Sequence, residues 1–193
     1  MKTIAVLLFD DVEVLDACGP FEVFATSKTA GGDLAFRVVT VAHRAGTIRA
    51  VGGLGLVADF GIYDCPPCDV LVVPGGVGRK REVENEELVQ WIGERAKTCE
   101  IILSVCTGAF LLAKAGLLHG LTVTTHHSAH EELAAISGIA VDTNARYVDN
   151  GRIVTAAGIA AGIDASLHVV GRLLGGDRAE ATASRMEYSP RFE

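Results

Sequence analysis

The chain has 193 residues, and its formal charge is −7 because 24 acidic residues outnumber 17 basic ones. Apolar residues make up 49% of the chain, which is typical of a globular protein and excludes a disordered one. The acidic balance argues against nucleic-acid binding, and no apolar run reaches the roughly 18 residues of a membrane span. At about 100–200 residues per domain, we expect one domain over residues 1–193.

The start of the chain and its cysteines bear on the cellular compartment. Asp10 and Asp11 cut the first apolar run short, and no small-residue cleavage site follows it, so a signal peptide is not expected. Five cysteines leave at least one thiol unpaired under any intramolecular pairing scheme. We therefore expect a cytoplasmic protein whose cysteines are mostly reduced.

Apolar runs alternate with helical patterns along the chain. In chain order, we expect a strand at 3–9, a turn at 15–20, a short helix from Pro20 to about Ser27, a strand at 36–41, a hairpin at 47–57, a strand at 69–73 and a helix at 85–98. The second half is expected to hold a strand at 101–105, a helix at 107–115, a strand at 122–125, a helix at about 129–136, a hairpin at 147–154 and helices at 159–174 and 177–186. Asn150-Gly151 indicates a type I′ turn in the second hairpin.

This alternation predicts an α/β fold, a three-layer sandwich with a mostly parallel sheet covered on both faces and an added β-hairpin. In such sheets, chemistry is located outside the carboxyl ends of the strands. Three places qualify: the segment containing Asp16, the glycine-rich run at 74–78, and Cys106.

Cys106 lies between a buried strand and a helix, in the run Ser104-Val105-Cys106-Thr107-Gly108. This spacing resembles the nucleophile elbow of hydrolases, in which the reactive side chain stands on a sharp turn above the sheet. The helix N-terminus is expected to lower the thiol pKa and favour the thiolate. The alternative is that Cys106 is simply a small buried apolar residue, as many free cysteines are.

Two other loops could complete a site around this thiol. Gly75 and Gly76 follow a predicted strand, and their backbone N–H groups could stabilise an anion, although a tight turn alone would also explain them. Asp16 could serve as an acid or base if burial raises its pKa, or it could merely hydrogen-bond local backbone N–H groups.

These motifs, taken together and in this order, resemble the ThiJ/PfpI family of the class I glutamine-amidotransferase-like superfamily, and the match covers nearly the whole chain. The resemblance implies a flavodoxin-like fold, a homodimer and no cofactor or metal. The matching text is Phe9-Asp10, Leu15-Asp16, Gly19-Pro20-Phe21-Glu22-Val23-Phe24, Val73-Pro74-Gly75-Gly76, Ser104-Val105-Cys106-Thr107-Gly108-Ala109, Leu112-Ala113-Lys114-Ala115-Gly116-Leu117-Leu118, Thr124-Thr125-His126 and Ala157-Gly158-Ile159-Ala160-Ala161-Gly162-Ile163-Asp164.

Two branches of the family share this text. One hydrates isonitriles to N-substituted formamides, and the other is the ligand-sensing domain of AraC-type regulators. For the hydratase branch, the resemblance implies that Cys106 is the nucleophile and Asp16 the acid/base. Thr107 would hydrogen-bond at the site, Gly75 and Gly76 would line the pocket with backbone N–H groups, and His126 would lie close enough to contact a small-molecule substrate.

Other activities fit this sequence less well. Protease-like members carry a histidine directly after the nucleophilic cysteine, where this chain has Thr107, and glyoxalase-type members use a glutamate in the first-strand loop, where Glu13 is nearby. An amidase- or glyoxalase-like hydrolase and a non-catalytic ligand or redox sensor remain alternatives.

Two further motifs receive simpler interpretations. Cys65 and Cys68 have thioredoxin-like spacing, but a strand rather than a helix follows them, so we expect a turn. His126 and His130 could share a helical face as metal ligands, yet no third ligand is evident, and no metal site is expected.

Overall fold

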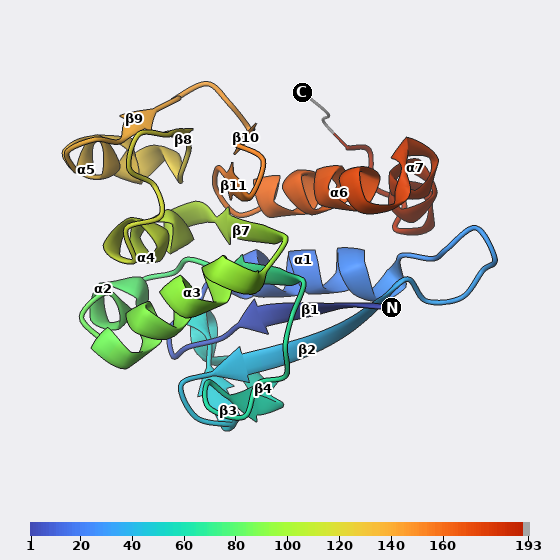
Figure 1. Cartoon of the computed structure of the whole chain (residues 1–193), viewed down its shortest axis with the longest axis horizontal. Helices are drawn as coiled ribbons and strands as arrows, with labels where there is room; N and C mark the ends of the chain where they lie inside the picture. The colour runs from blue at the N-terminus through green and yellow to red at the C-terminus, as the bar shows by residue number, and fades with distance from the viewer. Residues whose placement is uncertain (191–193) are drawn as a thin grey trace.

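The computed structural model describes residues 1–190, and a seven-stranded sheet forms its centre (Figure 1). The strand order is β10-β11-β7-β6-β1-β2-β5, and every neighbouring pair is parallel except β10 and β11. The predicted α/β sandwich with a mostly parallel sheet is therefore confirmed. The strands are β1 (Lys2–Leu7), β2 (Phe36–Ala42), β5 (Phe60–Gly61), β6 (Val70–Val73), β7 (Ile101–Val105), β10 (Tyr147–Asp149) and β11 (Ile153–Ala156).

The central strands are apolar because both of their faces are covered. Every residue of β6 and β7 is buried, as expected for parallel strands between two helical layers. One layer contains α1 (Val14–Thr26), α6 (Ala161–Leu174) and α7 (Gly176–Arg185), which pack against one another, and α3 (Glu86–Thr98) and α4 (Ala109–Lys114) form the other (Figure 1). Within residues 1–190, no helix is long and apolar enough to cross a bilayer.

Smaller elements decorate the sandwich. The expected first hairpin is present as β3 (Gly46–Arg49) and β4 (Gly55–Ala58). The strand expected at 122–125 is present only as the shorter β8 (Thr122–Val123). It pairs with β9 (Ala140–Val141) outside the main sheet. The short helices α2 (Arg79–Glu82) and α5 (His130–Ala134) complete the fold.

The first helix begins earlier than its sequence indicates. We expected a turn at 15–20 and a helix from Pro20, but α1 starts at Val14 and contains Pro20. Pro20 has no N–H to donate to the Asp16 carbonyl one turn earlier, which costs the helix a hydrogen bond. The helix packs closely on α6 at the preceding residue, where a Cβ on Gly19 would lie 3.1 Å from the Ile163 side chain. Asp16 therefore lies in the first turn of a helix.

The second hairpin is present, but its turn differs from the expectation. A type I′ turn needs positive φ at two consecutive residues, predicted at Asn150 and Gly151. Only Gly151 of these two has a positive φ, at 81°. The Asn150 N–H donates to the Ile153 carbonyl at 2.9 Å, so the two residues between them make the turn.

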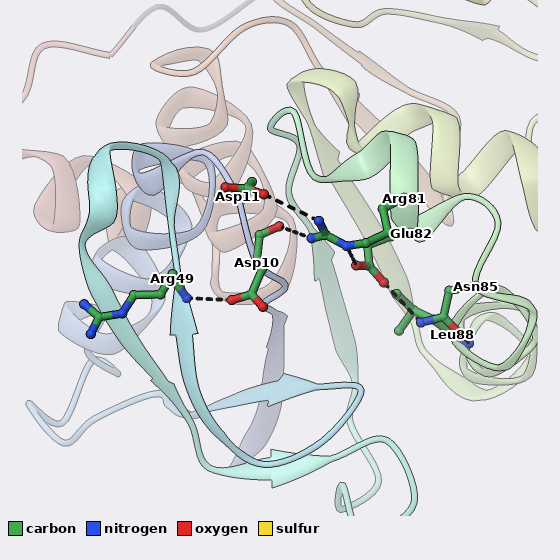
Figure 2. Close-up of polar contacts among 7 residues, drawn as sticks. All are labelled: Asp10, Asp11, Arg49, Arg81, Glu82, Asn85 and Leu88. Carbon is green, nitrogen blue, oxygen red and sulfur yellow. Dashed lines mark hydrogen bonds and ion pairs between the residues drawn. The ribbon is translucent and has the colours of Figure 1, made fainter.

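A polar network fixes the loop between β1 and α1 (Figure 2). Arg81 donates to the Asp10 carbonyl at 2.7 Å and pairs with the Asp11 carboxylate at 3.5 Å. The Asp10 carboxylate in turn accepts the Arg49 N–H of the β3–β4 hairpin at 2.7 Å. Helix α3 begins beside this network, where the Asn85 side chain accepts the Leu88 N–H at 3.2 Å (Figure 2). The loop that leads to Asp16 is thus anchored from two sides.

Candidate active site

Four loops meet at the carboxyl edge of the sheet, one from each of the adjacent strands β11, β7, β6 and β1. The β7 loop carries Cys106, the β6 loop carries Gly75, and the β11 loop carries Ile159. The β1 loop runs into α1, which carries Asp16. The three predicted places therefore converge on one site, as the topology of a parallel sheet requires.

Cys106 occupies a strained turn directly after β7. Its φ is 55°, a left-handed conformation that is uncommon for residues other than glycine. The Cys106 N–H donates to the Ala157 carbonyl at 2.9 Å, and its carbonyl accepts the Thr125 hydroxyl at 2.7 Å. Gly108 lies so close to β6 that a Cβ there would be 2.1 Å from the Val73 carbonyl oxygen. These contacts form an elbow of the kind that the sequence spacing predicts.

Asp16 is fully buried behind this turn. Its Oδ2 accepts the Gly75 N–H at 3.0 Å, whereas Oδ1 makes no hydrogen bond of ordinary geometry within residues 1–190. Burial raises the pKa of Asp16 to about 7, although the Gly75 N–H and the Cys106 thiol both oppose the increase. The carboxyl can therefore gain or lose a proton near neutral pH.

The Cys106 thiol has a raised pKa, contrary to our expectation from the helix N-terminus. Burial and the charge of Asp16 raise this pKa to about 12, and they outweigh the backbone N–H groups of Thr107 and Ile159, which favour the thiolate. Because the two groups interact, their titration belongs to the pair. The thiol is therefore protonated at neutral pH, beside a carboxyl whose pKa is about 7.

Gly75 and Gly76 lie at the site, but their N–H groups already donate hydrogen bonds within the protein. Gly75 donates to Asp16, and Gly76 donates to the Thr107 hydroxyl at 3.1 Å. A Cβ on Gly75 would lie 2.5 Å from both the backbone nitrogen and the hydroxyl oxygen of Thr107. The two glycines therefore position Asp16 and Thr107 rather than presenting free donors. The N–H groups that face the sulfur belong to Thr107 and Ile159, and we did not assign the Ile159 group from the sequence.

A cavity of about 370 Å³ opens onto Cys106. Asp16 is fully buried and is not among the residues that line this cavity. Arg79 is a lining residue that the sequence analysis missed; it pairs with Glu132 at 2.5 Å and lies 3.8 Å from the centre of the Phe110 ring. The lining residues are Glu13, Val51, Gly76, Val77, Arg79, Lys80, Cys106, Thr107, His126, Ser128, Ala129, Glu132 and Ile159.

His126 lines the same cavity, close to where the sequence placed it. Its Nδ1 accepts the Ser128 N–H at 3.3 Å, which leaves the ring proton on Nε2. Burial and the neighbouring histidines lower the pKa of His126, so the ring is neutral at pH 7. His130 faces elsewhere and hydrogen-bonds the Thr125 carbonyl at 3.1 Å. Over residues 1–190, no three His, Cys, Asp or Glu residues are grouped in a way that could hold a metal ion.

Comparison with known proteins identifies the family. The model of the DJ-1/PfpI family matches residues 2–172. The chain belongs to the DJ-1/PfpI family. It is 35% identical over 187 residues to an isonitrile hydratase from Pseudomonas putida, a match that covers 97% of this chain and 78% of the relative. The family resemblance seen in the sequence is therefore confirmed.

Other proteins similar to this chain differ from it in length. A transcriptional regulator, GbdR of Pseudomonas aeruginosa, is 28% identical over 188 residues; the match covers 97% of this chain but only 51% of the regulator. A ThiJ/PfpI family protein from Pseudomonas syringae superimposes with a TM-score of 0.88 at 30% identity, covering 99% of this chain and 76% of that one. Drosophila melanogaster DJ-1beta shares the fold, with a TM-score of 0.83 at 18% identity over 97% of this chain and 98% of its own.

Proposed function

We propose that this protein is a cysteine-dependent hydratase that converts a small isonitrile into the N-substituted formamide. The observation that carries the proposal is the Asp16–Cys106 pair: a buried carboxyl with a pKa of about 7 contacts the thiol, and the thiol lines a cavity of about 370 Å³. The similarity to the Pseudomonas putida isonitrile hydratase supports the choice of substrate.

In the first half of the reaction, the Cys106 sulfur attacks the terminal carbon of the isonitrile. The Asp16 carboxylate accepts the thiol proton as the C–S bond forms, and it then returns this proton to the carbon now attached to the sulfur. The product is a thioimidate, R–N=CH–S–Cys106. Asp16 suits this role because its carboxyl is buried next to the sulfur and does not line the cavity that the substrate occupies.

In the second half, water adds to the thioimidate carbon and the C–S bond breaks. One proton of this water ends on the substrate nitrogen and the other on the Cys106 sulfur, so the formamide leaves and the thiol is restored. The N–H groups of Thr107 and Ile159 stabilise the departing sulfur, since both favour its anionic form. The His126 Nε2–H offers a hydrogen bond to the substrate from the cavity wall.

Turnover of n-butyl isonitrile tests this proposal. The purified protein should release N-butylformamide, measured by chromatography. Cys106→Ala should reduce the rate to background, and Asp16→Asn should lower it by roughly 10²–10⁴-fold, as expected when a general acid/base is removed. Cys65→Ser, at the other end of the sheet, is the control and should keep the wild-type rate. Unchanged activity in Cys106→Ala would overturn the proposal.

A sensor is the second candidate, and the similarity to GbdR favours it. In that case the cavity binds a ligand without turnover, or an oxidant converts Cys106 to sulfinic acid. An absence of turnover on isonitriles, amides and α-oxoaldehydes, together with ready oxidation of Cys106 by mild peroxide, would support the sensor instead.

We also propose that the protein is a homodimer in the cytoplasm. Leu15 and Phe21 on α1 and Val57 on β4 are 38%, 37% and 64% exposed. Phe21 and Val57 line one apolar cavity of about 210 Å³ together with Cys18 and Leu56. Burial of this apolar surface against a second copy would stabilise a dimer. Light scattering should give twice the chain mass, and Phe21→Lys should give the monomer mass.

A further inference from the structure

Three cysteines lie just beneath the surface at the amino edge of the sheet, opposite the edge that carries Cys106. Cys65 and Cys68 belong to the loop that enters β6, and Cys99 ends α3 just before β7. Their exposed fractions are 6%, 7% and 2%. The Sγ atoms of Cys68 and Cys99 lie 3.5 Å apart, so these two thiols are in direct contact.

The strand register explains this contact. β6 and β7 pair in parallel with Val70 opposite Ile101, and Cys68 and Cys99 each precede these residues by two positions. The backbone pairing extends toward them, because the Asp69 carbonyl accepts the N–H of the residue after Cys99 at 2.7 Å. Neighbouring strands lie about 4.7–4.9 Å apart, and disulfides span Cα separations of about 4.4–6.8 Å. The backbone at this position therefore suits a disulfide.

The local contacts give the two sulfurs different chemical characters. The hydrogen bond with Cys68 lowers the pKa of Cys99, and the positive charge of Arg95 lowers it further, while burial opposes both. The same hydrogen bond, together with burial, raises the pKa of Cys68. Cys68 is thus the proton donor in the contact between the two sulfurs, and Cys99 is the sulfur that more readily forms the thiolate, although the Cys99 thiol also donates to the Cys68 carbonyl at 3.2 Å. Arg95 is held beside the cluster by its 2.8 Å hydrogen bond to the Cys65 carbonyl.

Cys65 is less suited to pair with either sulfur, despite its Cys-x-x-Cys spacing with Cys68. Its thiol donates to the Pro66 carbonyl at 3.4 Å, and the described residues give it no sulfur within hydrogen-bond distance. Pro66 and Pro67 fix φ at two consecutive positions between the two cysteines, which restricts the loop.

We propose that Cys68 and Cys99 form a dithiol that a hydroperoxide oxidises to a disulfide, a redox site separate from Cys106. The Cys99 sulfur attacks the peroxide oxygen, the O–O bond breaks, and sulfenic acid and one water form from hydrogen peroxide. The Cys68 sulfur then attacks the Cys99 sulfur, the S–O bond breaks, and the released hydroxide leaves as water with the Cys68 proton. Overall, two thiols lose two electrons and two protons, and one peroxide becomes two waters.

The disulfide would join the start of β6 to the start of β7, closing a loop between residues 31 positions apart. Closing such a loop restricts the unfolded chain, so the oxidised protein should unfold at a higher temperature than the reduced one. β7 ends at Val105, directly before Cys106. Oxidation of Cys68 and Cys99 would therefore stabilise the strand that carries the elbow.

Peptide mapping of the full chain tests the proposal. The native protein is treated with hydrogen peroxide, free thiols are blocked by alkylation, and the unreduced digest is analysed by mass spectrometry. We expect one cross-linked pair of peptides containing Cys68 and Cys99, lighter by two hydrogen atoms and separated by dithiothreitol. The cross-link should also form in Cys106→Ala, because the site does not need that thiol.

Variants sharpen this test. Cys68→Ser and Cys99→Ser should abolish the cross-link and the rise in unfolding temperature, whereas Cys65→Ser should retain both. Circular dichroism checks that each variant is folded, and the wild-type map decides the question even if a variant is not. A Cys65–Cys68 link, or oxidation confined to Cys106 with Cys68 and Cys99 fully alkylated, would overturn the proposal.

Discussion

The hydroxyl of Thr125 donates a 2.7 Å hydrogen bond to the carbonyl of Cys106, 19 residues earlier in the chain. This bond and the Cys106 N–H bond to Ala157 hold the cysteine at a φ of 55°. Positive φ at a residue other than glycine costs about 1–3 kcal/mol and persists only where surrounding contacts impose it. Thr125 is therefore a positioning residue for the elbow.

Replacing this hydroxyl should weaken both stability and activity. Thr125→Val keeps the shape of the side chain but leaves the buried Cys106 carbonyl without its partner, which costs about 1–3 kcal/mol. Urea unfolding should show this loss. Thr125→Ser retains the hydroxyl and is the matched control, expected close to wild type. A Thr125→Val protein as stable as wild type would show that the bond does not support the turn.

A side chain at Gly75 should disrupt the site. The Cβ of Gly75→Ala would lie 2.5 Å from the nitrogen and the hydroxyl oxygen of Thr107 and 3.0 Å from Asp16, so these groups must move. We expect a loss of about 1–3 kcal/mol in unfolding free energy and at least a tenfold loss of turnover. Gly93→Ala is the control, because its Cβ would meet nothing within 4 Å and alanine favours a helix. Equal behaviour of the two variants would refute the steric argument.

The rate of hydration should depend on pH through the Asp16–Cys106 pair. The carboxyl must be ionised to accept the thiol proton, and its pKa is about 7. We therefore expect kcat/KM to rise with pH and level off above an apparent pKa near 7. Asp16→Asn should remove this rise along with most of the activity. A flat profile from pH 5 to 9 in the wild-type protein would contradict the role of Asp16.

The stability of the folded protein should fall as pH rises, whereas the rate should rise. The Asp16 pKa is about 7 in the folded protein, against an ordinary value of 3.8, so the folded state binds this proton more tightly. The resulting stabilisation is fully present below pH of about 4 and is lost as pH rises through 7. Relative to Asp16→Asn, the wild type should lose stability over this range, with roughly 4 kcal/mol as the upper bound. Urea unfolding of both proteins at several pH values measures this, and parallel curves would contradict it.

Much of the fold and the place of the site follow from local patterns. Strands such as Ile101–Val105 are continuous apolar runs, and parallel topology places the residues after them at one edge of the sheet. The position of Cys106 after such a strand, with Gly108 two residues later, was therefore sufficient to predict the elbow.

Other features depend on tertiary packing that local patterns do not encode. Pro20 indicates a helix start, but α1 begins at Val14 and packs on α6 at Gly19, with Pro20 inside the helix. The thiol pKa of Cys106 was expected to fall because its position next to a helix is visible in the sequence, whereas its burial and the facing Asp16 carboxylate are not. The partner of the Gly75 N–H likewise depends on where α1 places Asp16.

Acid-quench mass spectrometry during turnover tests the covalent mechanism most directly. The wild-type protein mixed with n-butyl isonitrile should show a population heavier by the mass of one isonitrile, and digestion should locate the adduct on Cys106. Cys106→Ala should show neither adduct nor formamide. If formamide accumulates at the wild-type rate in Cys106→Ala, the sulfur is not the nucleophile and the proposed chemistry is wrong.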